Sequence, residues 1–593
     1  MASDPPLPVP HHVRWRRWAR SRPGVWFPWA AALSLGLAAL LPACGSAAAS
    51  APATHEITLV GGIQTEPNWW FPVVPEAFNG TNNDGIGLMY RPLVWIANNG
   101  TIDFTRSIAA KIVVSRDDTV YTVTMNPKWH WSDGRPVTAA DAVFGWDIYQ
   151  ATGQPSAPWN NSAMGSRSLD AVKSVTQSGP RSITITLNHP YNPVWAELDV
   201  LNYASPIPRF VWDKYANMTQ ELKWLYSMGN KPLNAAFRVV DGPYDVSRYV
   251  PSEYWTMQAN PRYDGHRPQF TTLVYQYETS ADNVFVSLRK GTFATANLPT
   301  SYYGSAKQLT QYRIATNGYD FSFNIIQPNF AANTKTLGGL FNNLYLRQAM
   351  QMGINEPLIA KAFYKGFAVP DYTVVARSPT NRFYDAHLPV YYPYNPAKGR
   401  KLLEKHGWHL VDGVMEKHGM KLAFDFIYMS GSTTDEHIVE YLQQSWAQEG
   451  IDVTLVPMPF NQILSVTATP ATANQWTMVY WGAGWYGGLG YPSLSLFETG
   501  TADNSEQYSN SHLDALIRAA LAPGTPAQAL ARLDAYEQYA AQQLPALFLP
   551  EYIGVGSPAP FHAVKPWLQG VSRYHEPVAG GSEPWRWTVG PAK

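Results

Sequence analysis

The sequence predicts an α/β fold with two lobes, in which mixed sheets are flanked by helices. Three observations lead to this prediction. The chain has 593 residues, which is more than one hydrophobic core usually supports. Its first half contains short segments in which apolar and polar residues alternate, as they do in half-buried strands. Its second half alternates strand-like runs with helical periodicity, which predicts a mostly parallel sheet covered by helices.

The composition is that of a folded globular protein. Apolar residues make up 45% of the chain and charged residues 15%, with no sign of long disordered stretches. Five basic residues and one acidic residue lie within 1–43, which leaves 39 basic residues against 43 acidic ones. Because this remainder is slightly negative, we expect no nucleic acid as a partner.

The N-terminus has the order of an export signal. Five arginines within residues 14–22 precede an apolar stretch at 25–43. The stretch leads into Leu41-Pro42-Ala43-Cys44-Gly45, which resembles the lipobox of bacterial lipoproteins. This resemblance implies cleavage before Cys44 and lipidation of its thiol.

An uncleaved membrane helix is the alternative interpretation, since about 20 apolar residues can span a bilayer. Pro28 and Pro42 argue against a continuous helix. We therefore expect a lipoprotein signal peptide at 1–43, a flexible tether at 44–54, and a mature chain held by Cys44 on the extracytoplasmic side of the cell membrane, in a periplasm or on the outer face. Cys44 is the only cysteine, so no internal disulfide is expected.

Strands are predicted in the first half wherever apolar and polar residues alternate. They are Glu56–Val60, ending at Gly61-Gly62, a segment within Ser115–Met125, and Ser182–Leu187. Between the last two, Thr138 has the residue type of a helix N-cap and Asp141 falls in the first turn, so a helix is expected from Ala139.

The second half is predicted to alternate helices and strands. Apolar residues recur at three- and four-residue spacings in four predicted helices, Arg347–Phe363, Ala397–Lys405, Asp435–Gln448 and Pro526–Gln543. Apolar runs between them predict the strands Lys421–Tyr428, Ile451–Val456 and Trp476–Trp481.

The segment Tyr121–Phe144 (YTVTMNPKWHWSDGRPVTAADAVF) resembles the signature of the family 5 extracellular solute-binding proteins, the dipeptide, oligopeptide and nickel group of ABC transporters. Further resemblances occur in the family's order along the chain. They are Gly242-Pro-Tyr244, Asn260-Pro-Arg-Tyr263, Phe323-Asn324, Leu346-Arg347-Gln348-Ala349, Tyr394-Asn395-Pro396 and Gly450-Ile451-Asp452-Val453. The resemblance therefore spans nearly all of the mature chain.

This resemblance implies a two-lobed periplasmic-binding-protein fold of class II, in the large cluster with an extra subdomain. Lobe I would comprise 55–88, 238–316 and 542–593, with the extra subdomain at 89–237, and lobe II would comprise 317–541. The implied function is that of a monomeric substrate-binding component of an ABC importer. It would capture a peptide-like or other small solute by hinge closure, contact the permease subunits and use no cofactor.

Two departures from the family pattern bear on the ligand. Peptide-binding members carry Trp-Gly-x-Asp, whose aspartate meets the ligand's amino group, whereas this chain has Trp481-Gly482-Ala483-Gly484. Asp503 and Glu506 lie nearby in the sequence and are candidate substitutes. The solute stays open, and a nickel chelate is a further class within the family. Asn355 and Asn395 replace commoner aspartates, which indicates a surface or capping change.

Aromatic residues make up 13% of the chain and suit a ligand-binding cleft. Ligand contact is predicted for Trp69 and Trp70, which follow a strand end, and for Trp481, Trp485 and Tyr486 in a glycine-rich loop. Core packing is the alternative for each. It is the favoured interpretation for three other tryptophans in or beside strands, Trp129, Trp131 and Trp476.

Three polar residues complete the candidates. Asn324 is predicted either to bond the ligand or to be a turn residue. Arg377 has the chemistry to clamp a carboxylate, although exposed arginines usually only solvate a surface. Arg347 is predicted to be structural.

The sequence shows no Gly-x-Ser-x-Gly elbow, no His-Glu-x-x-His helix and no phosphate-binding loop with lysine. His406 and His409 lack a further ligand at metal-binding spacing, so no metal site is expected. We predict a binding protein rather than an enzyme. A secreted hydrolase and a non-transport receptor or adhesin with the same fold are the alternatives.

Overall fold

The computed structural model describes residues 58–75, 79, 81–97, 100–161, 167–316, 322–333, 335–377, 381–482, 485–486, 491–492, 494–501, 503–552, 561–571, 573 and 582–590. The predicted signal peptide, Cys44 and the tether lie outside these residues. A membrane-crossing helix needs a long apolar run, and the helices within the described ranges contain none.

A seven-stranded sheet lies where lobe I is predicted, with the strand order β10-β22-β9-β1-β8-β7-β6. Its strands are β1 (Thr58–Ile63), β6 (Tyr244–Val250), β7 (Tyr254–Ala259), β8 (Thr272–Tyr277), β9 (Thr295–Leu298), β10 (Arg313–Thr316) and β22 (Phe561–Val564). The strand β1 runs parallel to β8 and β9, while the other pairs are antiparallel.

The first strand differs from its prediction, because it continues through Gly61 and Gly62 instead of ending there. Both glycines pair with β8. A Cβ placed on Gly62 would come within 2.6 Å of the Phe293 ring, so the missing side chain lets this ring pack against the strand.

A second sheet has the strand order β17-β16-β18-β11-β19, and β20 also pairs with β11. Its strands are β11 (Ser322–Pro328), β16 (Ala423–Met429), β17 (Asp452–Met458), β18 (Met478–Tyr480), β19 (Trp485–Tyr486) and β20 (Leu547–Leu549). The strand β16 is parallel to β17 and β18, but β11 is antiparallel to its neighbours. The sheet is mixed rather than mostly parallel, because β11 enters from the first sheet instead of through a helical crossover.

The chain passes between these two sheets twice. It goes from β10 to β11, and it returns from β21 (Glu551–Tyr552), which pairs with β12 (Ala368–Val369), to β22. The strand β20 lies within the range 542–593 predicted for lobe I, yet it pairs with β11 of the second sheet. The division into lobes otherwise stays a prediction.

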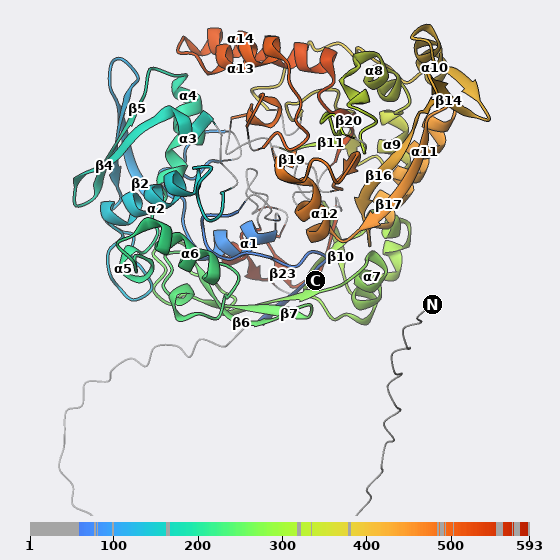
Figure 1. Ribbon diagram of the computed structural model, residues 1–593. Coiled ribbons are helices and arrows are strands. Elements are labelled where there is room, and N and C mark those ends of the chain that lie inside the picture. The colour runs from blue at the N-terminus through green and yellow to red at the C-terminus, as the bar shows by residue number, and fades with distance from the viewer. Residues whose placement is uncertain are drawn as a thin grey trace, which may run out of the picture. The chain divides into compact units, whose positions relative to one another are not determined.

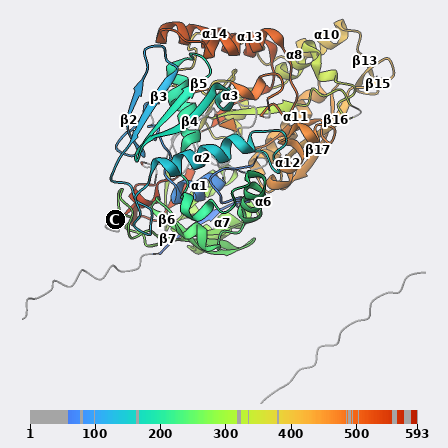
Figure 2. The ribbon, with the colours of Figure 1, turned by 60° about the vertical axis from the view of Figure 1, so that its left-hand side comes forward.

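A four-stranded antiparallel sheet with the order β2-β3-β5-β4 lies in the predicted extra subdomain. Its strands are β2 (Ala109–Val114), β3 (Val120–Met125), β4 (Val172–Gly179) and β5 (Ser182–Leu187). Figure 2 shows α2 (Ala139–Thr152) beside this sheet. The strand at 182–187 and the helix start at Ala139 are as predicted.

Helices cover the second sheet and border it. They are α8 (Leu344–Met352), α9 (Glu356–Ala362), α10 (Pro396–Lys405), α11 (Thr433–Ala447), α12 (Phe460–Thr467), α13 (Ser511–Leu521) and α14 (Pro526–Gln543). In Figure 1, α11 lies beside β16 and β17, and α13 lies along α14. The remaining α-helices and strands are α1 (Thr81–Met89), α3 (Arg167–Ala171), α4 (Pro193–Trp195), α5 (Arg209–Trp212), α6 (Met218–Met228), α7 (Ala281–Lys290), β13 (His409–Val411), β14 (Val414–Lys417), β15 (Met420–Lys421), β23 (Leu568–Gln569) and β24 (Thr588–Val589).

The helix predicted at Arg347–Phe363 is two helices, α8 and α9. Asn355 begins the second one, since its Oδ1 accepts a hydrogen bond from the Leu358 amide at 3.0 Å. Asn395 caps α10 in the same way, accepting from the Lys398 amide at 3.0 Å. The capping role predicted for both asparagines is confirmed.

Candidate functional site

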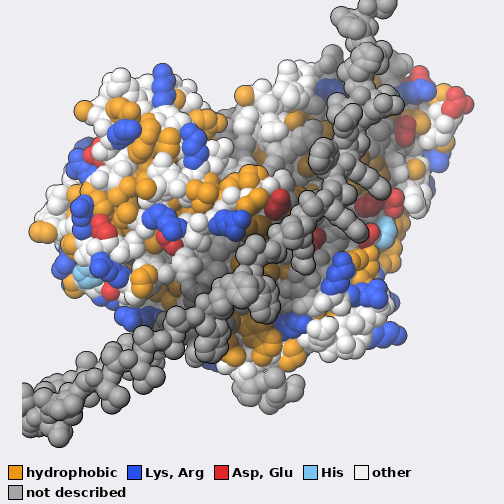
Figure 3. Space-filling model, turned by 90° about the horizontal axis from the view of Figure 1, so that it is seen from below, with side chains coloured by type: hydrophobic (Ala, Val, Ile, Leu, Met, Phe, Trp, Pro, Cys, Tyr) orange, Lys and Arg blue, Asp and Glu red, His pale blue; other side chains and the backbone are white. Residues whose placement is uncertain are grey.

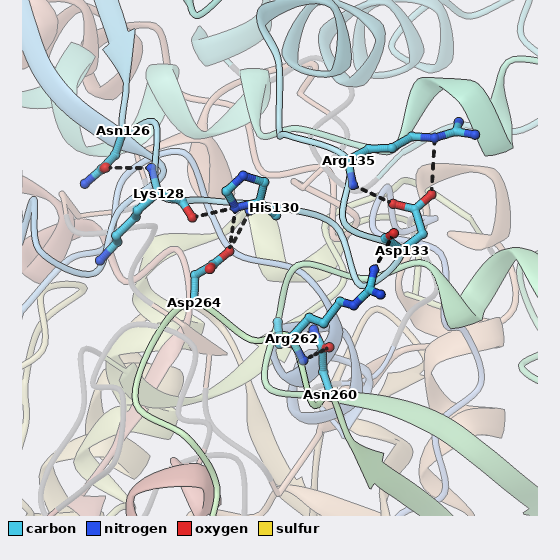
Figure 4. Close-up of polar contacts among 9 residues, drawn as sticks. Asn126, Lys128, His130, Asp133, Arg135, Asn260, Arg262 and Asp264 are labelled. Atoms are coloured by element: carbon cyan, nitrogen blue, oxygen red, sulfur yellow. Dashed lines mark hydrogen bonds and ion pairs between the residues drawn. The ribbon is translucent and has the colours of Figure 1, made fainter. Parts of the chain in front are cut away.

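Two of the motifs that carry the family resemblance meet at one corner of the molecule (Figure 4). The Arg262 side chain donates to the carbonyl of Asp133. The Asp264 carboxylate accepts from the backbone amide of His130 at 2.8 Å and lies 3.2 Å from its ring Nδ1. A third motif joins them, because the Asn260 side chain donates to the Gly242 carbonyl at 3.0 Å. These motifs hold the fold together at this corner.

The same corner contains a buried carboxylate whose oxygens are all engaged. Asp141 is the third residue of α2, and its Oδ2 accepts from the Thr138 amide at 2.9 Å and the Thr138 hydroxyl at 2.7 Å. The same oxygen accepts from the Trp131 indole at 3.3 Å, and Oδ1 accepts from the Arg209 amide at 2.9 Å. Trp129, Trp131 and Trp476 are buried, as the core interpretation predicted.

Asn324 lies in a different setting, a buried polar network in the second sheet. It sits within β11, paired with Leu549, so the turn interpretation is wrong. Its Nδ2 lies 3.4 Å from the Pro550 carbonyl, 3.4 Å from the Tyr364 hydroxyl and 3.5 Å from the Tyr480 hydroxyl. Its Oδ1 is buried and has no hydrogen-bond partner.

Asp435 joins this network from the first turn of α11. Its Oδ1 accepts from the Tyr480 hydroxyl at 3.1 Å, whereas its buried Oδ2 has no partner. A Cβ on Gly482 would come within 2.6 Å of that Oδ2, so the carboxylate lies directly against Gly482. Burial raises the pKa of Asp435 to about 7, against the lowering effect of hydrogen bonds from Ser432 and Tyr480.

The sequence did not identify Asp435, Tyr364 or Tyr480 as site residues. A signal was present for Tyr480, which directly precedes Trp481-Gly482. Its partner across the sheet is Ile326, two residues beyond Asn324 and therefore on the same face. Asp435 offered only the pattern of a helix start.

The structure places Trp69 and Trp70 among packed aromatic side chains. Trp69 is 4% exposed, donates its indole N–H to the Val73 carbonyl at 3.0 Å, and lies 5.5 Å from the Trp159 ring. Trp70 is 1% exposed and makes an edge contact with Trp255 at 6.0 Å. Ligand contact by either residue stays a prediction.

The second predicted aromatic group lies around Gly482. Trp481 is partly buried and donates its indole N–H to the Thr467 hydroxyl at 3.1 Å. The backbone of Trp485 and Tyr486 forms β19 and pairs with Ser322 and Phe323, next to Asn324. The structure describes only the backbone of these two residues, so their contact with a ligand stays a prediction.

The structure places the two arginines differently. Arg377 is exposed and its Nη1 donates to the Pro370 carbonyl at 3.1 Å, while its backbone amide donates to the Glu551 carboxylate at 3.0 Å. Arg347 is buried and donates to main-chain carbonyls, including that of Leu544 at 2.9 Å. Its predicted structural role is confirmed, and burial lowers the pKa of Arg347 to about 10.

The candidate substitutes for the absent acid are engaged in other hydrogen bonds. Asp503 accepts from the Ser495 hydroxyl at 2.6 Å, and Glu506 accepts from the Gln327 amide at 3.1 Å. Burial raises the pKa of Asp503 to about 6 and that of Glu506 to about 8.

Across the described ranges, no group of three or more His, Cys, Asp or Glu side chains is arranged to hold a metal ion.

Polar contacts also link the residues of the two predicted lobes. Asn461 on α12 accepts from the Asn79 side chain at 2.7 Å, and its own side chain lies 3.4 Å from the Glu66 carbonyl. The Asn192 side chain of the extra subdomain donates to the Tyr491 hydroxyl at 3.2 Å. The face in Figure 3 carries both basic and acidic side chains among hydrophobic and uncharged ones.

Comparisons with known proteins agree with this architecture. A Brucella ovis protein with the provisional name ABC transporter peptide-binding protein is 25% identical over 447 residues, covering 73% of this chain and 75% of that protein. The structure of AppA from Bacillus subtilis in complex with a nonapeptide aligns with a TM-score of 0.76 and 19% identity over 90% of this chain and 99% of AppA. NikZ from Campylobacter jejuni in complex with Ni(L-His) aligns with a TM-score of 0.72 and 18% identity over 90% of this chain and 99% of NikZ.

These structural likenesses show the two-lobed periplasmic-binding-protein fold. A family model matches residues 103–506. It describes the middle region of the bacterial extracellular solute-binding proteins, family 5. Since the match covers more than half of the chain, the protein belongs to the family 5 bacterial extracellular solute-binding proteins.

Proposed function

We propose that the chain is the lipid-anchored substrate-binding component of an ABC importer for peptide-like solutes. The observation that carries this proposal is the family match over residues 103–506. The name of the Brucella ovis relative and the fold shared with AppA, which was solved with a nonapeptide, favour peptide as the ligand class. Binding without catalysis is part of the proposal.

Capture by lobe closure is supported by the connectivity of the two sheets. Among the described strands, the chain passes from the first sheet to the second between β10 and β11 and returns between β21 and β22, and two such connections suit a hinge. The contacts of Asn461 with Asn79 and Glu66 would form when the lobes approach. A ligand that touches both lobes binds the closed form better and shifts the population toward it.

Anchoring rests on the sequence around Cys44. A lipid on this thiol would hold the mature chain at the membrane beside the permease subunits. With Cys44→Ser, we expect the protein to lose the lipid-modified N-terminus and to keep its uncleaved signal peptide, whose apolar stretch holds it in the membrane. Membrane fractionation with mass spectrometry of the N-terminus checks this. Retention of a cleaved, membrane-bound Cys44→Ser protein would contradict the anchor.

Native mass spectrometry of the protein purified from its own host tests the ligand class. We expect a co-purified peptide of unchanged mass after incubation. A co-purified nickel chelate would replace the peptide proposal with another family 5 ligand. Cleavage of added peptides would instead support the hydrolase, and unchanged peptide uptake in cells lacking the protein would support a non-transport receptor.

A further inference from the structure

One face of the molecule is more basic than the chain as a whole. It comprises residues 128–136, 209–231 and 260–267, and we call it the basic face. These segments contain eight Lys and Arg residues against four Asp and Glu residues, and one of the four acids, Glu221, is buried. The chain after residue 43 has 39 basic residues against 43 acidic ones. The excess of positive charge is therefore local.

Direct contacts join the three segments of the basic face. The first and third meet at the corner drawn in Figure 4. The guanidinium of Arg135 lies over the Phe210 ring at 4.2 Å, which adds α5 to this corner. Beyond α5, the Nζ of Lys214 lies 5.0 Å from the ring of Trp224 in α6, and Tyr215 makes an edge contact with the same ring at 6.4 Å.

Large aromatic side chains are open to solvent among these cations. Phe210 is 43% exposed, Tyr215 38% and Tyr226 52%. On α6, Leu222 is buried, whereas Lys223 and Tyr226 lie about one turn apart and are both exposed. In Figure 3, Lys and Arg side chains lie among hydrophobic ones on the side that carries α5 and α6 in Figure 1. Aromatic rings mixed with Lys and Arg are typical of protein surfaces that lie at the headgroups of a membrane.

The predicted tether reaches the folded chain beside this face. Thr58 begins β1 and pairs with Thr272 of β8, which pairs with Gln258 of β7. Two strand spacings, about 10 Å, therefore separate Thr58 from Gln258, and β7 ends at Ala259, directly before the segment 260–267. The chain between Cys44 and Thr58 spans at most about 50 Å. A lipid on Cys44 would hold this end of the molecule near the bilayer.

We infer that the basic face rests on a bilayer surface that contains anionic phospholipids. This deepens the proposed function and rests on its lipid anchor. Anionic headgroups attract Lys and Arg side chains that come within about 8 Å of the surface at physiological salt, and the exposed rings suit the headgroup level. The contact holds the molecule in one orientation on the membrane, whereas the tether alone would let it turn freely.

Flotation with lipid vesicles tests this contact on the chain from Gly45 onward, which lacks the anchor. Residues 56–593 form one compact unit, so this chain keeps the complete folded part. The vesicles contain phosphatidylcholine alone or an equimolar mixture with phosphatidylglycerol. We expect at least about 10-fold tighter binding to the mixed vesicles, since each basic group near an anionic surface contributes about 5-fold. Added salt should weaken this binding.

Two double variants with the same change in net charge locate the contact. Lys223→Glu with Lys231→Glu alters the basic face, while Lys401→Glu with Lys405→Glu alters exposed positions of α10, which lies on the opposite side of the molecule from α6 in Figure 1. We expect the first pair to abolish the preference for mixed vesicles and the second pair to preserve it. If the first pair does not fold, the two vesicle types compared on the unchanged chain decide alone.

Equal binding to both vesicle types, or binding to neither, would overturn the membrane contact. Equal losses in the two double variants would also overturn it, because only net charge would then matter. Dimerisation seen by analytical ultracentrifugation and abolished by Lys223→Glu with Lys231→Glu would assign the face to a second copy of the chain instead. These outcomes leave the peptide importer standing, since no peptide is present, and a failure of the anchor shows separately in the N-terminal mass of the native protein.

Discussion

Asp141 and Asp435 are the same residue at the same helical position in two regions of the molecule. Each is the third residue of its helix, after an N-cap of Thr138 or Ser432, and each is buried. Asp141 turns back to its own cap, and both of its oxygens accept hydrogen bonds. Asp435 turns away toward Tyr480 and Gly482, and one of its oxygens has no partner.

The difference shows how one local pattern is satisfied to different degrees. Around Asp141 the chain supplies every donor, so the carboxylate fixes a corner at which the family's motifs meet. Around Asp435 the described residues supply fewer donors, so one carboxylate oxygen has no hydrogen-bond partner. Buried carboxylates with an unpartnered oxygen also occur elsewhere among the described residues, Glu449 and Asp241 among them, so the contrast between Asp141 and Asp435 is a local one.

The largest effect is expected from Asp141→Asn. In asparagine an NH₂ group replaces one carboxylate oxygen. This group cannot accept the hydrogen bonds from Thr138 and Trp131, so they would be lost. We expect the free energy of unfolding to fall by about 3 kcal/mol, as measured by urea denaturation. The matched variant Asp435→Asn should cost far less stability. Equal losses in the two variants would break the comparison.

The pH dependence of stability separates the two regions next. The pKa of Asp435 is raised to about 7 in the folded state by burial, so the folded chain holds this proton more tightly than the unfolded chain does. Its stability contribution is complete below the ordinary pKa near 4 and is lost as pH rises through about 7, at about 1.4 kcal/mol per pH unit between those limits.

Buried Asp241, with its pKa raised to about 7, and Glu506, with its pKa raised to about 8, act in the same direction. We therefore expect the urea midpoint to fall between pH 5 and pH 8. Urea titrations across this range should show a shallower fall in Asp435→Asn than in the unchanged protein. An unaltered slope in that variant would show that Asp435 titrates normally.

The smallest effects are expected from the two N-caps. Thr138→Ala and Ser432→Ala should each lower the free energy of unfolding by about 1 kcal/mol, the usual cost of losing a cap. The Asp435 amide donates to the Ser432 hydroxyl at 3.3 Å, as expected of a cap. Urea denaturation measures both losses, and a loss in either variant far above this value would show that its side chain does more than cap the helix.

The sequence predicted those features whose determinants are local. The start of α2 follows from Thr138 and Asp141, and the buried state of Trp129 follows from its place beside a strand. The break between α8 and α9 was missed although Gly353 and Asn355 carry ordinary stop and start signals, because the apolar periodicity continues across them.

The candidate site depends on contacts between distant segments, which the sequence does not reveal. Asp435 approaches Gly482 only because α11 packs beside a sheet in which β18 pairs with β11. Trp69 and Trp70 follow a strand end, which predicted a place in a cleft, but aromatic neighbours from α6 and β7 surround them. Burial by such neighbours is a tertiary property.

Small-angle X-ray scattering of the mature chain, with its co-purified ligand and after removal of that ligand by reversible unfolding, tests the two-lobed capture most directly. We predict a smaller radius of gyration for the loaded protein and its return to the larger value when ligand is withdrawn. Identical scattering curves at saturating ligand would contradict capture by lobe closure.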